Sequence, residues 1–281
     1  MFAKMVSKYG TIAAVCDPHE IANVCGEEGI DYMIESAKKS CIKLFFALPS
    51  CVPATSFETN GASIDSDTLE KYSDKVVALG EMMNYPGVIY NDAKVMSLIE
   101  TARKFSLPID GHAPGVTGEN LDKYISAGVS TDHECFSYSE AVEKIAKGMK
   151  VIIREGSAAR NLESLFPLLN DHIDDVMFCT DDSHPDDVIE RGHISRFVHY
   201  ALSRGISIFD LYKPLLLTPN KHYGLEVGEL RVGDKADFLV VDNLTSYNVL
   251  KSVVNGCDCT EIRTTDAGYS SSNYVNTFVD R

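Results

Sequence analysis

The sequence predicts an α/β fold, a (β/α)8-type (TIM-like) barrel that lacks its first strand and is followed by part of a small β-sandwich. Short β-branched or apolar runs alternate with amphipathic helical stretches, which is typical of βαβ units in a parallel sheet. Ionisable residues end several of these runs. A barrel collects such residues on one face, whereas an open sheet concentrates them at one switch point. A barrel also accommodates 281 residues in one unit.

Seven runs predict the strands of this barrel. They lie at residues 11–17, 42–50, 76–82, 107–113, 129–134, 150–156 and 175–182. A closed barrel of this kind has eight strands. The chain opens with a helical stretch, MFAKMVSKYG, that leads directly into the first run. We therefore expect the first strand to be the absent one and an upstream segment to be missing.

Helical stretches lie between the runs. In NDAKVMSLIETARKF, the apolar residues Val95, Leu98, Ile99 and Ala102 recur at helical spacing. A capping box from Ser137 to Glu140 predicts the start of another helix. Each strand is thus expected to lead into a helix.

The chain divides into three expected parts. Residues 1–224 form the incomplete barrel. In LEVGELRVGDKADFLVVDN, Gly228 and Gly233 punctuate two β runs, so residues 225–256 are expected to supply the returning strands of a small sandwich domain. Residues 257–281 are a polar tail that we expect to be poorly ordered.

The composition restricts the partners. A net charge of −15 argues against nucleic acid and anionic membranes and favours a neutral or cationic small molecule. The sequence shows neither a leader nor an apolar run of about 20 residues, so we predict a cytoplasmic protein. The eight cysteines form no C-x-x-C pair, and those inside apolar runs, such as Cys16 and Cys179, are interpreted as buried thiols, whereas Cys257 and Cys259 have no assigned role. The edges of an open barrel predict a homo-oligomer or association with the missing segment.

Four candidate metal ligands stand at strand ends: Glu81, His112, His133 and Asp181. Imidazole nitrogen and carboxylate oxygen suit zinc, iron or manganese better than calcium. A lone strand histidine is usually structural, but four such residues at one face favour a metal site. Asp182 adds a second carboxylate, which would handle protons or orient substrate, or would belong to a solvated acidic turn.

Four further residues are candidates for substrate contact. His19 and Glu20 follow the first run, where they would contact substrate or cap the next helix. Arg154 and Ser157 end the sixth run and are expected to face the same mouth. Pairing with Asp181 and Asp182 or binding of substrate would each explain Arg154.

Several segments resemble a known family. GHAPG, DHEC, REGSAARN, CTDDSHPDD and DPHEIANV closely resemble segments of bacterial adenine deaminases, a family of the amidohydrolase superfamily. GELRVGDKADFLVVD is similar to the returning sandwich strands of that superfamily. The resemblance runs from residue 2 to about residue 256, and its motifs are long.

The resemblance implies hydrolysis of adenine to hypoxanthine and ammonia at a binuclear manganese or iron centre, with zinc also compatible. It implies Glu81 as the bridging carboxylate, and His112 and His133 as ligands. Asp181 matches the aspartate of the family's last strand, which would take a proton from water and return it to the leaving nitrogen. Asp181 and Asp182 are therefore the expected catalytic residues.

One feature departs from the family. Its first strand ends in an H-x-H pair that binds one metal, and no H-x-H occurs in this sequence. Glu81, His112 and His133 would then hold a single ion, or none. Two alternatives stay open: hydrolysis of another cyclic amidine or amide, and a catalytically inactive fragment or paralogue.

Overall fold

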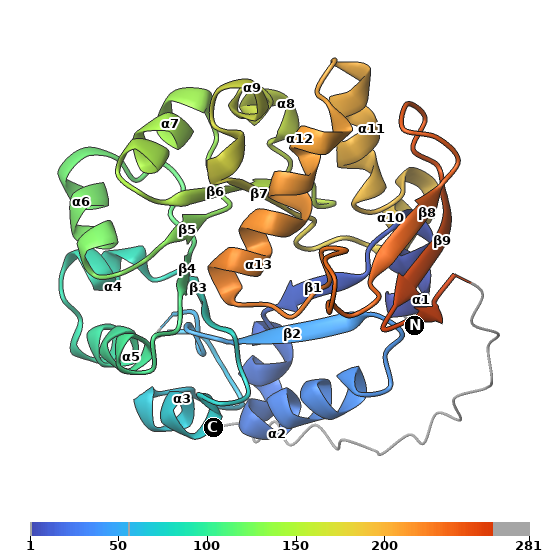
Figure 1. The fold of residues 1–281 in the computed structure, drawn as a ribbon. Helices are drawn as coiled ribbons and strands as arrows, with labels where there is room; N and C mark the ends of the chain where they lie inside the picture. The colour runs from blue at the N-terminus through green and yellow to red at the C-terminus, as the bar shows by residue number, and fades with distance from the viewer. Residues whose placement is uncertain (1, 56, 261–281) are drawn as a thin grey trace.

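The computed structural model describes residues 2–55 and 57–260 and contains a curled parallel sheet (Figure 1). All seven predicted strands are present, so the predicted fold class is confirmed. They are β1 (Ala13–Cys16), β2 (Lys43–Leu48), β3 (Ala78–Met82), β4 (Ile109–Gly111), β5 (Thr131–Asp132), β6 (Lys150–Arg154) and β7 (Val176–Cys179). Each is shorter than its predicted run, because residues at one or both ends of the run lie in loops.

The strands pair in chain order, and every neighbouring pair in this sheet is parallel. One segment has the order β1-β2-β3-β4 and the other β5-β6-β7. A single parallel bridge between Ile109 and Val129 joins them. Because parallel strands point the same way, the residues that follow them gather at one rim.

The helices are α1 (Phe2–Val6), α2 (His19–Ala37), α3 (Ser66–Tyr72), α4 (Tyr85–Ile89), α5 (Ala93–Lys104), α6 (Gly118–Ser126), α7 (Tyr138–Ala146), α8 (Leu162–Leu165), α9 (Leu168–Asp171), α10 (Pro185–Arg191), α11 (Ser195–Ser203), α12 (Ile208–Tyr212) and α13 (Thr218–Tyr223). These helices lie mostly around the outside of the curled sheet, whereas α12 and α13 lie in front of it in the view of Figure 1. Three further turns are η1 (Ser7–Tyr9), η2 (Ile173–Asp175) and the π-helical η3 (Lys213–Leu217).

Two helices confirm local sequence signals. The buried residues of α5 are the four predicted from its spacing, Val95, Leu98, Ile99 and Ala102. At the start of α7 the Ser137 side chain accepts a hydrogen bond from the backbone N of Glu140, at 3.3 Å. Local capping and periodicity therefore determine where these helices begin and which face they bury.

The gap between the two outer edges of the curled sheet is spanned by His193. Its Nδ1 lies 2.7 Å from the Thr11 hydroxyl, just before β1, and its Nε2 lies 3.0 Å from the Thr180 hydroxyl, just after β7. The residue is only 4% exposed. The imidazole thus connects the first and last strands of the barrel sheet through two side-chain hydrogen bonds.

A small antiparallel sheet follows, with β9 (Val249–Val254) between β8 (Phe238–Val241) and β10 (Cys257–Asp258). The Asp237 carboxylate joins it to the barrel through an ion pair with Lys43 of β2. Because β10 lies beyond residue 256, the first residues of the predicted polar tail are ordered. Residues 261–281 of that tail lie outside the described residues, and the boundary at 224/225 stays a prediction.

All eight cysteines are free, and Cys51, Cys135 and Cys259 are buried. Cys16 and Cys179 are only partly buried, and Cys257 is exposed. Among residues 2–55 and 57–260, no helix combines the length and the apolar character needed to cross a bilayer.

Candidate metal centre

Glu81 lies in β3 with its carboxylate toward the inside of the curled sheet, and its side chain is 12% exposed. Two contacts hold its backbone. Its N–H donates to Asp17 Oδ2 at 2.8 Å, and its carbonyl accepts from the Ser50 hydroxyl at 2.6 Å. Residues from β1, β2 and β3 therefore determine where the carboxylate lies.

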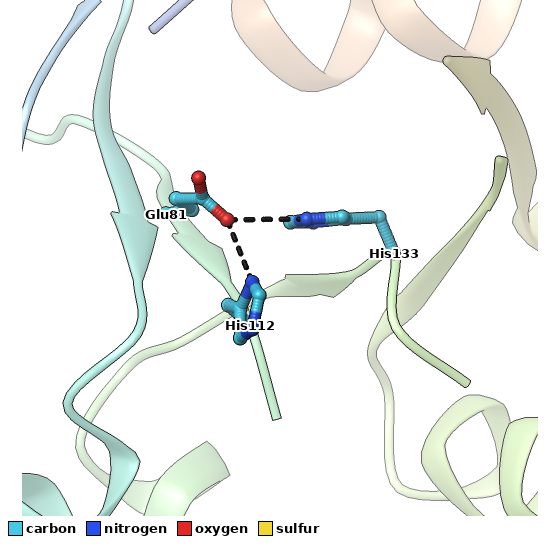
Figure 2. Close-up of side chains that lie close together, drawn as sticks. All are labelled: Glu81, His112 and His133. Atoms are coloured by element: carbon cyan, nitrogen blue, oxygen red, sulfur yellow. Dashed lines mark hydrogen bonds and ion pairs between the residues drawn. The ribbon is translucent and has the colours of Figure 1, made fainter. Parts of the chain in front are cut away.

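His112 and His133 stand directly after β4 and β5, and both rings point to the same oxygen of Glu81 (Figure 2). His112 Nδ1 lies 2.7 Å from Glu81 Oε2, and His133 Nε2 lies 3.1 Å from it. The two rings meet edge to face, with centroids 5.2 Å apart. Three strand ends thus bring one carboxylate and two imidazoles together, as their sequence positions predict.

These three side chains fit a divalent cation. Their ligand atoms all lie within 4.8 Å of one another. His133 Nε2 is buried and has no hydrogen-bond partner in the described residues, although it faces Glu81. Burial alone favours the neutral carboxyl, but the hydrogen bond from His112 and the close contact with the His133 ring outweigh it and lower the pKa of Glu81 well below its usual range. An ionised carboxylate and two imidazoles suit zinc, iron or manganese.

Asp181 lies beside this group at the end of β7. Its Oδ1 is 3.8 Å from His133 Nε2, and its Oδ2 is 2.7 Å from Arg154 Nη2. Its φ of +50° is in the left-handed region, which aspartate tolerates better than most residues and which turns the chain sharply after the strand. Arg154 also pairs with Glu134. Of the two explanations for Arg154, the structure contains the pairing with Asp181.

Asp182 and Ser157 make no hydrogen bond or ion pair with Glu81, His112 or His133 among the described residues. Asp182 is exposed, and within the described chain no hydrogen bond or ion pair of its carboxylate is found. Its carbonyl accepts from the backbone N of Ser157 at 2.8 Å. The Ser157 hydroxyl accepts from the backbone N of His184 at 2.8 Å. The structure therefore brings Asp181, but not the Asp182 carboxylate, next to the histidines.

His19 reaches the cluster from the start of α2. Its Nδ1 lies 3.4 Å from Glu81 Oε1 and 3.5 Å from Asp17 Oδ1. On the other side of the ring, Nε2 lies 3.5 Å from the carboxylate of Glu20, whose side chain is 65% exposed. Asp17 was not among the predicted site residues, although its place at the end of the first run in DPHE is the kind of signal that identified the others.

A buried ion-pair network supports both histidine loops from α7. Lys144 is 0% exposed, and its Nζ donates to Asp132 at 2.7 Å, to Glu140 at 2.6 Å and to the Ala113 carbonyl at 2.8 Å. The other oxygen of Asp132 accepts from the backbone N of Ala113 at 2.8 Å. Asp132 precedes His133 and Ala113 follows His112, so this network fixes the backbone beside both imidazoles.

A curled parallel sheet thus carries a carboxylate and two imidazoles at its carboxyl rim, a donor set that suits a divalent cation. The sequence profile of the Amidohydrolase family matches residues 1–265, and the chain belongs to that family. The chain is 53% identical over 258 residues to an adenine deaminase of Methanosarcina mazei and 46% identical over 279 residues to an adenine deaminase of Salinibacter ruber. These alignments cover 91% and 99% of this chain, and 46% and 51% of the relatives. The chain thus spans about half the length of these relatives.

Solved structures share the fold at low sequence identity. A β-aspartyl dipeptidase from Fervidobacterium islandicum aligns with a TM-score of 0.67 at 13% identity, covering 92% of this chain and 75% of its own. A 5-methylcytosine deaminase from Klebsiella pneumoniae aligns with a TM-score of 0.60 at 17% identity, covering 91% and 72%. These similarities confirm the barrel-type fold.

Proposed function

We propose that this chain carries the catalytic barrel of a metal-dependent adenine deaminase, which hydrolyses adenine to hypoxanthine and ammonia. The observation that carries the proposal is the convergence of Glu81, His112 and His133 on one point. The 53% identity to a protein named adenine deaminase suggests the reaction. Manganese or iron is the proposed ion, with zinc as a further candidate. A divalent ion bound there supplies Lewis-acid activation of water at neutral pH.

The residues around the cluster have distinct proposed roles. Glu81, His112 and His133 hold the ion, and Asp181 lies close enough to His133 to act at the same point. Asp181 accepts the proton of the attacking water and returns it to the amino nitrogen that leaves as ammonia. Its ion pair with Arg154 keeps one carboxylate oxygen occupied and so orients the other. Asp182, although its carboxylate is exposed, is retained as a proposed second proton carrier.

Adenine binding is proposed for Arg154, Ser157, His19 and Glu20, which lie around the same rim. A small uncharged substrate also agrees with the net charge of −15, which disfavours nucleic acid and anionic membranes as partners. A cytoplasmic location and a homo-oligomer, or association with a further segment, complete the proposal.

The test is ammonia release by the metal-loaded chain from adenine, compared with dihydroorotate and hydantoin. We expect manganese-dependent turnover of adenine alone. Activity only on the other two compounds would identify another cyclic amide hydrolase. Tight metal binding without turnover of any of the three would reject catalysis by this chain and favour an inactive fragment or paralogue.

A further inference from the structure

We propose that Tyr223, the last residue of α13, is a positioning residue for the two histidines of the metal group, His112 and His133. It acts through Asp110 of β4, to whose Oδ1 its hydroxyl donates at 2.9 Å from 113 residues away in the sequence. The inference rests on the proposed function, because it assumes that both histidines bind one ion. It adds a residue from a helix that the sequence did not connect with the site.

The two histidines stand on opposite sides of a joint in the curled sheet. His112 follows β4, the last strand of one sheet segment, and His133 follows β5, the first strand of the other. Among the described residues, a single parallel bridge between Ile109 and Val129 joins the two segments. Backbone pairing therefore constrains the distance between the two rings only weakly, and side-chain hydrogen bonds across the joint have to supply the rest.

A pair of hydrogen-bonded side chains crosses this joint two residues before each histidine. Asp110 Oδ1 accepts from the Thr131 hydroxyl at 2.8 Å, and the Thr131 oxygen accepts from the Gly111 N–H at 3.2 Å. Thr131 is 0% exposed. Because side chains two residues apart in an extended chain point to the same side, this pair lies one layer below the two imidazoles. A shift of the pair therefore changes the spacing of the rings.

Helix α13 contacts both sides of the joint. Tyr223 and Thr131 donate to the same oxygen of Asp110, so the tyrosine fixes the carboxylate that the threonine also needs. The neighbouring His222 has its Nε2 3.4 Å from the hydroxyl of Ser130, which directly precedes β5. The helix thus reaches β4 through one side chain and the start of β5 through the next.

The local structure holds Tyr223 in place. Gly224, with a φ of +65°, ends α13 directly after it, and the Gly224 N–H donates to the Asn220 carbonyl. The Asn220 side-chain amide donates to the Val227 carbonyl at 2.9 Å and to Glu229 Oε1 at 3.0 Å, which fixes the chain that leaves the helix. The tyrosine hydroxyl is therefore presented to Asp110 from a helix end that is capped and tied down.

The experiment compares Tyr223→Phe, which removes only the hydroxyl, with the matched control Tyr200→Phe. The Tyr200 hydroxyl is buried and has no hydrogen-bond partner in the described part of the chain. In Tyr223→Phe we expect the Mn²⁺ affinity, measured by isothermal titration, to fall about 10- to 100-fold. The absorption bands of Co²⁺ bound in place of Mn²⁺ should also shift, because they report the geometry of the ligands. Tyr200→Phe should leave the affinity and the bands unchanged.

Thr131→Val tests the route through Asp110, since it removes the other hydroxyl on the same carboxylate oxygen. If both hydroxyls act through that carboxylate, the loss of Mn²⁺ affinity in the double variant should be smaller than the product of the two single losses. Losses that multiply would overturn the route through Asp110.

An unchanged Mn²⁺ affinity and an unchanged Co²⁺ spectrum in folded Tyr223→Phe would overturn the proposal, even if urea denaturation showed a lower stability, because a purely structural hydroxyl changes stability alone. Equal changes in Tyr200→Phe would overturn it as well. The outcome is distinct from that of the adenine assay. A loss of metal affinity in a chain that does not deaminate adenine would support the positioning role and reject the function, whereas deamination with equal metal affinity in all variants would do the reverse.

Discussion

At the scale of single residues, the site depends on a few side chains whose partners come from distant parts of the sequence. Glu81 receives two imidazoles on one oxygen and lies near a third on the other. The histidines and Glu81 were predictable because each stands at the end of an apolar run. The hydrogen bond from Glu81 N to Asp17, 64 residues away, was not, because no local pattern encodes that contact.

Replacing His133 by glutamine should weaken Mn²⁺ binding to the Glu81, His112 and His133 group by at least about 100-fold, because a ring nitrogen with no hydrogen-bond partner among the described residues is removed. Adenine turnover should fall at least as far. Isothermal titration with Mn²⁺ and ammonia release measure the two effects. An unchanged affinity would remove His133 from the ligand set.

Gly80→Ala tests the close approach of Asp17 to the Glu81 backbone. The new Cβ would lie 2.1 Å from Asp17 Oδ2, so the carboxylate must move and the Glu81 N–H must lose its acceptor. We expect a loss of stability of about 1–3 kcal/mol in urea denaturation. Gly148→Ala provides a contrast, since a Cβ there meets nothing within 4 Å and only its positive φ opposes the change. An unchanged denaturation midpoint for Gly80→Ala would contradict the close contact with Asp17.

At the scale of elements, α7 connects the loops after β4 and β5. Its amphipathic pattern and its Ser137 cap predict where it forms, but not that its Lys144 is completely buried against Asp132 and the Ala113 carbonyl. A lysine on a helix is ordinarily read as a solvent-exposed residue. Lys144 is buried because α7 packs over the ends of β4 and β5.

Lys144→Met should destabilise the fold by about 3–5 kcal/mol, because Asp132 and Glu140 lose the cation that compensates their burial. Mn²⁺ affinity should fall as well, since both ligand loops lose a contact. The matched change Lys147→Met removes a partly exposed lysine at the C-cap of the same helix and should leave the denaturation midpoint nearly unchanged. If metal affinity survives Lys144→Met in the folded protein, the network supports the fold but does not position the ligands.

At the scale of the whole molecule, the two outer strands of the curled sheet are linked by a histidine that the strand patterns in the sequence do not predict. His193 lies between Thr11 and Thr180 and joins the two outer strands. Burial, with a further effect of Arg196, lowers the pKa of His193 to about 4 from its ordinary 6.5. The folded state therefore keeps this ring neutral over a range in which the unfolded chain binds a proton.

This difference predicts how stability depends on pH. The contribution of a neutral His193 is fully present above about pH 6.5 and is lost as the pH falls towards 4, by at most roughly 3 kcal/mol. His193→Gln should lack that part of the slope, whereas His172→Gln should retain it. Urea denaturation between pH 4 and 7 measures the slopes. Parallel curves for the unmodified chain and His193→Gln would contradict the prediction.

The sequence by itself determined the order and kind of the elements, the alternation of strand and helix, and the strand ends that carry Glu81, His112, His133 and Asp181. Those features follow from local periodicity, capping and polarity. The tertiary structure alone decided that Arg154 pairs with Asp181, that Asp17 holds the Glu81 backbone, and that His193 bridges the sheet edges. Each depends on distances of a few ångströms between segments far apart in the chain, and these are set by how the sheet curls.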